Sequence, residues 1–552
     1  MIGKSAAADG RSGEISFSVI EFLYYLYFAL MMFAKGIGLL EGSAPYTLFL
    51  LLGALVWTAK MLLTRYTAAD CLWILPLLAL GAMIYHRTGN YAPLIYFMVV
   101  TGMKGIPLRR AAKVALAVWG GTFLLQVVTA LLGLRADTYF IHDKLGQYLI
   151  RWSLGYPHPN VLHISYFILM ALLLYCLRWR GKRLWRLSGL LLLGDVYIFL
   201  YSLSYTGMLI TLFYLAANLY LTEKKELSVP DKGLLMLLPP LAIAFSVLGP
   251  VLLSGRAFSL FDKLLSTRFT LSRYFLTTQP IGLFGTRDFV LPDTSYGLDC
   301  SYVNALCMGG ILFFALLCLW YTALMPYLLH RGERAALAVT AATVIAGISE
   351  PFLVNTGFKN ITFLFIGEMM FAASAALAAK GPAFLGKPVC ILSWGGKRLV
   401  CRTVWMRALA ERWRRAGREN KKILLTIWLL AALLFGGIYA ATVQKPAVIY
   451  STLWNCDRKE GPEDAFDKYY VYIDKAQLPS DFNGRFLKYD GPQHPLYAYD
   501  GVTITFEYAR KAISAGALGA SALTGLCLLP MVGTGGKGNN SKTDGKKRAR
   551  KQ

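Results

Sequence analysis

The chain has few acidic residues and no recurring cysteine pattern. Its 552 residues include 57 Lys and Arg against 31 Asp and Glu, a net charge of +26. The nine cysteines are scattered singly, without a CxxC or Cys/His pattern, so neither a disulfide framework nor a zinc site is indicated. The basic excess does not indicate a nucleic-acid partner, because the cations lie in short connections beside apolar runs, where the positive-inside rule accounts for them.

Long hydrophobic runs dominate the chain. Hydrophobic residues make up 56% of the sequence and the mean hydropathy is +0.48. Repeated apolar blocks of the roughly 20 residues that cross a bilayer predict an all-α polytopic membrane protein in contact with membrane lipid. About twelve transmembrane helices form the expected bundle, and a two-helix hairpin follows it. The fourteen expected spans are centred near residues 27, 54, 78, 97, 122, 169, 195, 214, 243, 311, 345, 368, 433 and 520.

The distribution of charge predicts the orientation of these spans in the cytoplasmic (inner) membrane. One basic cluster covers residues 178–186 and another ends the chain at residues 546–551, so both are expected in the cytoplasm. Alternation from these anchors places both termini inside and residues 134–159, 254–298 and 444–506 outside. The polar opening leads directly into a span that carries Glu21 and has no typical cleavage site, so we expect the first span to stay as an anchor.

Composition divides the chain into four parts. Residues 1–379 form the expected membrane core and residues 380–422 a basic linker, which is either an interfacial helix on anionic lipid or an ordinary cytoplasmic connection. Residues 423–533 form the hairpin, and a basic tail covers residues 534–552. The external domain of the hairpin, residues 444–506, is rich in tyrosine and in turn residues, which predicts short strands. Its tyrosines either fill a small core or stack on sugars.

Arginines recur in the segments expected outside, against the positive-inside bias. They are Arg151, Arg256, Arg268, Arg273 and Arg287. A guanidinium keeps its charge and grips phosphate oxygens in a planar fork, so this set favours an anionic ligand such as a lipid-linked diphosphate. The alternative is that each arginine snorkels to outer headgroups. The five-residue spacing of Arg268 and Arg273 does not put both neatly on one helical face.

Four short segments resemble a known family. They are Arg151–Asn160, the Ser-Leu-Ser-Tyr-Thr-Gly turn at residues 202–207, Leu298–Tyr302, and Ser349–Phe352 with Asn355 nearby. Their order along a many-span chain is similar to that of Wzy-type polysaccharide polymerases, in the O-antigen ligase and polymerase superfamily, and the resemblance covers roughly residues 16–380. It implies a membrane glycosyltransferase that joins undecaprenyl-diphosphate-linked oligosaccharide repeat units on the outer membrane face, in capsule or exopolysaccharide assembly. Other polysaccharide assembly proteins are further expected partners.

The resemblance also implies roles for individual residues. Arg268, Arg273 and Arg151 would hold the diphosphate. Asn160 and His158 would bind sugar hydroxyls, with His158 alternatively a general base or only a helix-start residue. Glu350 and Asp299 are further base candidates or merely cap and ion-pair partners. Tyr302 is expected among the substrate-binding residues.

Two differences from related patterns bear on this expectation. The family often has arginine after Ser-x-Ser, where this chain has Tyr205, so the diphosphate site is expected to be rearranged. O-antigen ligases use a histidine in the large external loop, and residues 254–298 contain none, which argues against ligation.

The expected external loops contain no Asp-x-Asp pair, so we expect no metal and no cofactor. The competing class is a lipid-linked oligosaccharide transporter, in which Asp195 and Glu368 inside the membrane would carry protons.

Overall fold

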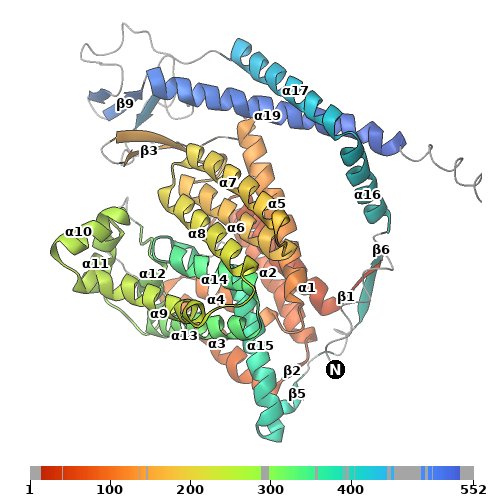
Figure 1. Ribbon diagram of the computed structural model, residues 1–552. Coiled ribbons are helices and arrows are strands. Elements are labelled where there is room, and N and C mark those ends of the chain that lie inside the picture. Colours follow the sequence, from red (N-terminus) through yellow and green to blue (C-terminus); the bar gives the residue numbers. More distant parts are fainter. Residues whose placement is uncertain are drawn as a thin grey trace, which may run out of the picture. The chain divides into compact units, whose positions relative to one another are not determined.

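The computed structural model divides the chain into two units (Figure 1). The core unit comprises residues 18–127 and 151–397, and the hairpin unit comprises residues 1–17, 128–150 and 398–552. One division falls at residues 397 and 398, within the basic linker expected from the sequence. The structure describes residues 14–39, 41–132, 134–135, 137, 139–144, 147–287, 297–354, 359–389, 392, 397–402, 404–443, 449–452, 487–490, 495–499 and 501–534.

The core unit is built of helices. Its elements are α1 (Val19–Gly36), α2 (Ala44–Leu63), β2 (Tyr66–Thr67), α3 (Ala68–Thr88), α4 (Ala92–Gly102), most of α5 (Leu108–Leu131), the end of β4 (Gln147–Trp152), α6 (Pro159–Leu177), α7 (Lys182–Ser202), α8 (Tyr205–Glu223), α9 (Val229–Leu252), α10 (Gly255–Leu264), α11 (Arg268–Thr278), α12 (Ser301–Met308), α13 (Gly310–His330), α14 (Arg334–Ala346), η1 (Pro351–Leu353), α15 (Thr362–Lys380), η2 (Ala383–Gly386) and β5 (Pro388–Val389).

The all-α polytopic membrane fold is confirmed. Among the described residues, twelve helices are long and apolar enough to cross a membrane, two of them in the hairpin unit. The expected spans near residues 97 and 345 coincide with α4 and α14, which have only 11 and 13 residues. Both are shorter than the roughly 20 residues a straight span requires. The bundle of the core unit therefore combines full-length spans with short buried helices.

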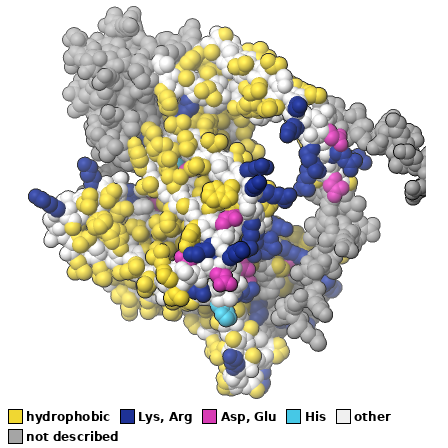
Figure 2. Space-filling view, viewed as in Figure 1, with side chains coloured by type: hydrophobic (Ala, Val, Ile, Leu, Met, Phe, Trp, Pro, Cys, Tyr) yellow, Lys and Arg dark blue, Asp and Glu magenta, His cyan; other side chains and the backbone are white. Residues whose placement is uncertain are grey.

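The short helices lie in the middle of the core unit. Every residue of α4 except Leu94 is buried, and α14 packs against α6, α8, α9, α13 and α15. Large hydrophobic side chains on α2, α7 and α9 are instead exposed, among them Leu55, Leu193 and Leu234. Figure 2 shows such side chains over a broad area of the visible face. An apolar surface of this kind suits contact with lipid.

Local sequence signals set the starts of several helices. Ser18 with Glu21, Thr67 with Asp70 and Ser228 with Asp231 each form a capping box, at the starts of α1, α3 and α9. In a capping box the two side chains satisfy backbone N–H groups that the first helical turn leaves unpaired. These helices therefore begin where the sequence has Ser or Thr followed three residues later by Glu or Asp.

A glycine pair interrupts the span expected near residue 311. Gly309 lies between α12 and α13, and Gly310, which has a φ of +87°, begins α13. A β-carbon on Gly310 would lie 2.2 Å from the backbone nitrogen of Gly285, so only glycine fits this approach. The loop after α11 docks here, because the Ile311 N–H donates to the carbonyl of Gly282 at 3.1 Å. This docking anchors the segment that carries Arg268.

The hairpin unit has two long helices and short strands. Its described elements are β1 (Glu14–Ser18), β3 (Tyr139–Lys144), most of β4, β6 (Arg398–Arg402), α16 (Val404–Glu419), α17 (Lys421–Thr442), β7 (Ile449–Thr452), β8 (Leu487–Asp490), β9 (Pro495–Tyr499) and α19 (Gly501–Thr534). Glycines allow α17 and α19 to pack closely, since a β-carbon on Gly516 would lie 2.5 Å from the carbonyl of Ala432. Strands β7, β9 and β8 form an antiparallel sheet in the segment for which short strands are predicted. Of the other residues in 444–506, the structure describes only 501–506, which begin α19.

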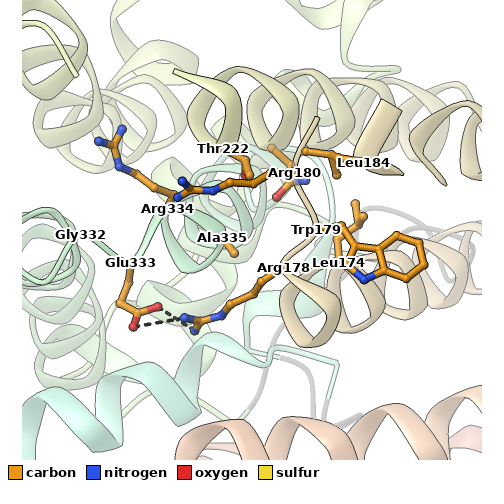
Figure 3. Close-up of a pocket in the computed structure, with 11 residues that line it drawn as sticks. Leu174, Arg178, Trp179, Arg180, Leu184, Thr222, Gly332, Glu333, Arg334 and Ala335 are labelled. Atoms are coloured by element: carbon orange, nitrogen blue, oxygen red, sulfur yellow. Dashed lines mark hydrogen bonds and ion pairs between the residues drawn. The ribbon is translucent and has the colours of Figure 1, made fainter. Parts of the chain in front are cut away.

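Polar groups gather at both ends of α6 and α8 in the core unit. We call the end at which α6 and α8 begin the site end, since Asn160 and Ser204 lie there. At the opposite end the two helices finish beside the start of α14, around a small cavity with several arginines (Figure 3). The 18 residue steps from Asn160 to Arg178 correspond to a rise of about 27 Å along a helix, close to the thickness of a bilayer core. The two polar groups therefore lie near opposite ends of the membrane-crossing helices.

Candidate functional site

A buried arginine and two carboxylates meet at the site end. Arg268, the first residue of α11, is 7% exposed, and its Nη2 atom lies 2.9 Å from Asp299 Oδ2 and 3.5 Å from Glu350 Oε1. The same Glu350 oxygen accepts a 2.8 Å hydrogen bond from the hydroxyl of Thr206 in α8. We call Thr206, Arg268, Asp299 and Glu350 the carboxylate cluster. It joins four segments that are far apart in the sequence.

Backbone contacts hold the carboxylate cluster in place. Arg268 Nε donates to the carbonyl of Ser349, and Nη1 donates to the carbonyl of Leu265 at 3.0 Å. The Ser301 hydroxyl donates to the carbonyl of Glu350, and the Ser301 N–H donates to Gly347 at 2.9 Å. The segment after α14 is thus tied both to α11 and to the start of α12. All three nitrogens of Arg268 are engaged by the protein.

A second arginine holds an amide nearby. Arg151, 5% exposed, donates from Nη2 to Asn160 Oδ1 at 2.5 Å and from Nε to the carbonyl of Ser202 at 2.8 Å. Asn160 Oδ1 also accepts from the Ser204 hydroxyl at 2.9 Å. We call Arg151, Asn160 and Ser204 the amide cluster. Within the described part of the chain, Nη1 of Arg151 has no hydrogen-bond partner, so this group can still bind an acceptor from a ligand.

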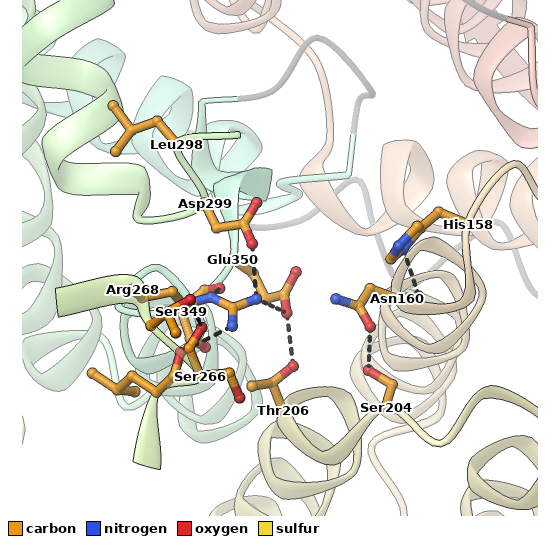
Figure 4. A network of polar contacts seen from close by, with 12 residues as sticks. His158, Asn160, Ser204, Thr206, Ser266, Arg268, Leu298, Asp299, Ser349 and Glu350 are labelled. Carbon is orange, nitrogen blue, oxygen red and sulfur yellow. Dashed lines mark hydrogen bonds and ion pairs between the residues drawn. The ribbon is translucent and has the colours of Figure 1, made fainter. Parts of the chain in front are cut away.

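The two clusters face each other. Figure 4 shows the Asn160 side chain pointing toward Glu350 and Thr206. Ser204 and Thr206 are two residues apart, at the turn into α8, and each belongs to a different cluster. This turn follows Leu203, whose φ of +43° ends α7 abruptly. The α7–α8 turn therefore links the amide cluster to the carboxylate cluster.

Charge and burial act on the groups between the clusters. Burial raises the pKa of the Glu350 carboxyl above its ordinary value, the charge of Asp299 adds to the rise, and Arg268 opposes it. Burial also lowers the pKa of Arg151 to about 10, a fall that the Glu350 charge opposes. Arg151 stays cationic at neutral pH. Glu350 thus lies within the field of two permanent cations, and such a carboxylate can accept a proton near working pH.

Buried polar residues support the amide cluster from inside the membrane. His163 Nε2 lies 2.7 Å from Asp195 Oδ1, and Nδ1 lies 3.1 Å from the Ser202 hydroxyl. All three side chains are fully buried. Ser202 is also the residue whose carbonyl accepts from Arg151. A continuous chain of contacts therefore runs from Asp195 in α7 through His163 to Arg151.

Two of the predicted substrate-binding residues make their contacts elsewhere. Arg273 donates from Nε to the carbonyl of Pro250 at 2.6 Å and from Nη2 to the carbonyl of Leu253, and it stacks over Phe258. It therefore satisfies the carbonyl end of α9. Tyr302 is fully buried and donates to the carbonyl of Val344 at 2.7 Å. Both side chains serve packing and helix termination in this structure.

His158 is a helix-start residue, which was one of the alternatives expected from the sequence. Its Nδ1 atom accepts a 3.1 Å hydrogen bond from the N–H of Asn160, which makes it the N-cap residue. The side chain borders the amide cluster in Figure 4. A histidine whose Nδ1 is used as a cap is held in one orientation, so it positions Asn160 whatever else it does. Asn355 lies outside the described residues.

Sequence reasoning missed two residues at the site. His163 lies in an apolar span, and an ionisable residue inside a membrane span is a functional candidate by default. The sequence therefore contained a signal for His163. Lys359 acts on the Glu350 carboxyl through its charge, and burial lowers the pKa of Lys359 to about 8. It follows the 349–352 segment in the chain, but no motif marks it. The suspected intramembrane acids both have partners, since Asp195 contacts His163 and Glu368 lies 3.5 Å from Arg331.

Comparison with known proteins gives no relative. No protein-family model matches the chain significantly, and neither does any curated protein or solved structure. The function therefore has to be argued from the site itself.

Proposed function

We propose that the protein is a membrane glycosyltransferase that polymerises polyprenyl-diphosphate-linked oligosaccharide repeat units. One observation carries the proposal: the buried Arg268 lies 3.5 Å from the buried carboxylate of Glu350, and the buried Arg151 lies close enough to interact with the same carboxylate through its charge, at one end of the membrane helices. Cations at a bilayer boundary suit a lipid-linked diphosphate. A carboxylate beside them suits removal of a proton from a sugar hydroxyl.

The proposed reaction transfers a glycan from one lipid carrier to another. A hydroxyl oxygen of the incoming repeat unit attacks the anomeric carbon of the growing chain, forming the new glycosidic bond. The bond from that carbon to the diphosphate oxygen breaks, and undecaprenyl diphosphate leaves with the electron pair. Glu350 accepts the hydroxyl proton. The site thereby loses one negative charge while the leaving group gains one, so the total charge near the two arginines does not change.

The two arginines would contribute differently. Arg151 has Nη1 available for a phosphate oxygen, whereas every nitrogen of Arg268 already has a protein partner. The Asp299 side chain is 41% exposed, so it is the partner that a diphosphate would displace from Arg268 most readily. Fixed cations at the leaving oxygen stabilise the charge that develops there. Asn160, Ser204 and Thr206 would orient sugar hydroxyls, as amide and hydroxyl groups do.

The test is turnover by the purified full-length protein with undecaprenyl-diphosphate oligosaccharide extracted from the host. We expect the wild type to produce a ladder of glycans. Arg151→Ala, Arg268→Ala and Glu350→Gln should each lower the rate at least a hundredfold, because each removes charge stabilisation or the base. Lys263→Ala is the matched control, since Lys263 is an exposed cation in α10, close to Arg268 in the chain and outside both clusters.

The outcomes separate the competing classes. Folding of each variant is checked by its gel-filtration profile and its unfolding temperature. A single transfer to another acceptor would indicate a ligase. Binding of the lipid without any transfer would indicate a transporter, and full activity of folded Glu350→Gln would exclude this carboxylate as the base.

A further inference from the structure

A second cationic site lies at the opposite end of the core unit from the carboxylate cluster. A cavity of about 80 Å³ lies between the ends of α6 and α8 and the start of α14. Arg178, Arg180 and Arg334 line it together with Glu333, as Figure 3 shows. Three cations face one carboxylate. The cavity therefore carries a net positive charge.

Two of these arginines have unused hydrogen-bond donors. Arg178 is paired with Glu333, with 2.7 Å between Nη2 and Oε2, but its Nε atom is buried and has no hydrogen-bond partner in the described part of the chain. The same is true of Nη1 of Arg334, whose Nη2 donates to the carbonyl of Lys225 at 3.4 Å. A buried donor without a partner costs about 1–3 kcal/mol, and more when charged. An acceptor from a ligand would remove this cost.

The size of the cavity and its neutral lining limit what can enter. A volume of about 80 Å³ equals the share of two or three waters in the liquid. It has room for a phosphate group, and any larger part of the ligand would lie outside it. Asn218, which is 2% exposed, and Thr222 also line it and offer neutral donors. Guanidinium groups with amide and hydroxyl donors form a typical phosphate site.

We propose that this cavity binds the phosphate group of an anionic phospholipid. Trp179, which also lines the cavity, is 39% exposed, as is usual for tryptophan at a lipid–water interface. Lys182 and Arg183 lie in the first turn of α7, next to the cavity in the chain. Basic pockets between transmembrane helices bind phospholipid headgroups in this way. The lipid tails would lie along the apolar helices, and this site is independent of the proposed glycan transfer.

Calorimetric titration of the full-length protein in detergent tests the proposal. The probes are short-chain phosphatidylglycerol, short-chain phosphatidylcholine and inorganic phosphate. We expect phosphatidylglycerol to bind, and Arg334→Ala to weaken it at least tenfold. Glu333→Gln should tighten binding severalfold, because it removes the competing carboxylate from Arg178. Arg186→Ala is the matched control, an exposed arginine near the cavity that does not line it.

Each outcome has a definite meaning. Unchanged affinity in folded Arg334→Ala, or equal loss in Arg186→Ala, would overturn the proposal in favour of general surface attraction. Equal binding of phosphatidylcholine would also overturn it, because the net charge would then be irrelevant. If the wild-type cavity binds inorganic phosphate but not phosphatidylglycerol, the bound phosphate group does not come from a phospholipid, and the proposal is overturned. Should Arg334→Ala fail to fold, Glu333→Gln decides, since weaker binding there contradicts the proposal.

Discussion

At the scale of single residues, Glu350 combines burial with several charged neighbours. Its side chain is buried, and it lies in the field of Arg151, Arg268, Asp299 and Lys359. A buried charge without partners would cost several kcal/mol. The arginines and Thr206 offset that cost. Glu350 therefore has the partners to remain ionised and the burial to bind a proton more tightly than an ordinary glutamate.

The transfer rate should depend on pH through Glu350. A general base works only when ionised, so kcat/KM should fall as the pH drops through its pKa. Because burial and the charge of Asp299 raise that pKa, the fall should begin at a higher pH than for an ordinary glutamate. Asp299→Asn removes one cause of the rise and should shift the fall to lower pH. A pH profile of both proteins checks this, and an unshifted profile would contradict the role of Glu350 as the base.

The buried pair of His163 and Asp195 should matter for stability. His163→Leu leaves the fully buried Asp195 carboxylate without this partner, and breaking a buried pair costs about 3–5 kcal/mol. Asp195→Asn keeps a polar partner for the imidazole and should cost much less. Thermal unfolding in detergent, followed by intrinsic fluorescence, measures both. An equal loss of stability in the two variants would show that the contact between His163 and the Asp195 carboxylate does not determine the stability of the protein.

At the scale of helices, α6 and α8 approach closely at Gly207. A β-carbon there would lie 2.5 Å from Cγ of His163, whose ring is buried. Gly207→Ala should therefore displace the ring and destabilise the protein by about 1–3 kcal/mol. Gly189→Ala in α7 is the control, because no atom lies within 4 Å of its added β-carbon. It should be neutral or stabilise by about 0.5–1 kcal/mol.

Activity distinguishes displacement of the ring from simple loss of stability. His163 contacts Ser202, and Ser202 holds Arg151, so Gly207→Ala should also slow transfer at temperatures where the variant is folded. A folded Gly207→Ala protein with the wild-type rate would mean that this chain of contacts does not position Arg151.

The sequence predicts the helices better than the contacts between them. Hydropathy locates the helices that are long enough to span, because the bilayer demands about 20 apolar residues. It gives the wrong length where helices are short and buried, as in α4 and α14, or interrupted, as at Gly310. Which of Arg268 and Arg273 reaches Glu350 depends on how α11 is rotated about its axis, and the sequence does not give this rotation. Five residues rotate a helix by about 140° from the starting direction, so one arginine meets Glu350 while the other meets the end of α9.

At the scale of the whole molecule, the distribution of charge decides which way the site faces. The site end of the core unit carries the two clusters, and the opposite end carries Arg178, Arg180 and Arg334 beside the basic start of α7. Short cytoplasmic connections are enriched in Lys and Arg. The rule therefore predicts that the site end faces outward, where lipid-linked repeat units would be joined.

Cysteine labelling in intact cells tests this orientation. Arg256→Cys lies in α10 at the site end and Arg183→Cys lies in α7 at the opposite end, and both positions are exposed. In a background without the nine native cysteines, a membrane-impermeant maleimide should label position 256 in intact cells and position 183 only after permeabilisation. Labelling of both positions after permeabilisation is the control for reactivity. The reverse pattern in intact cells would place the arginine and carboxylate clusters in the cytoplasm, and polymerisation on the outer face would then be excluded.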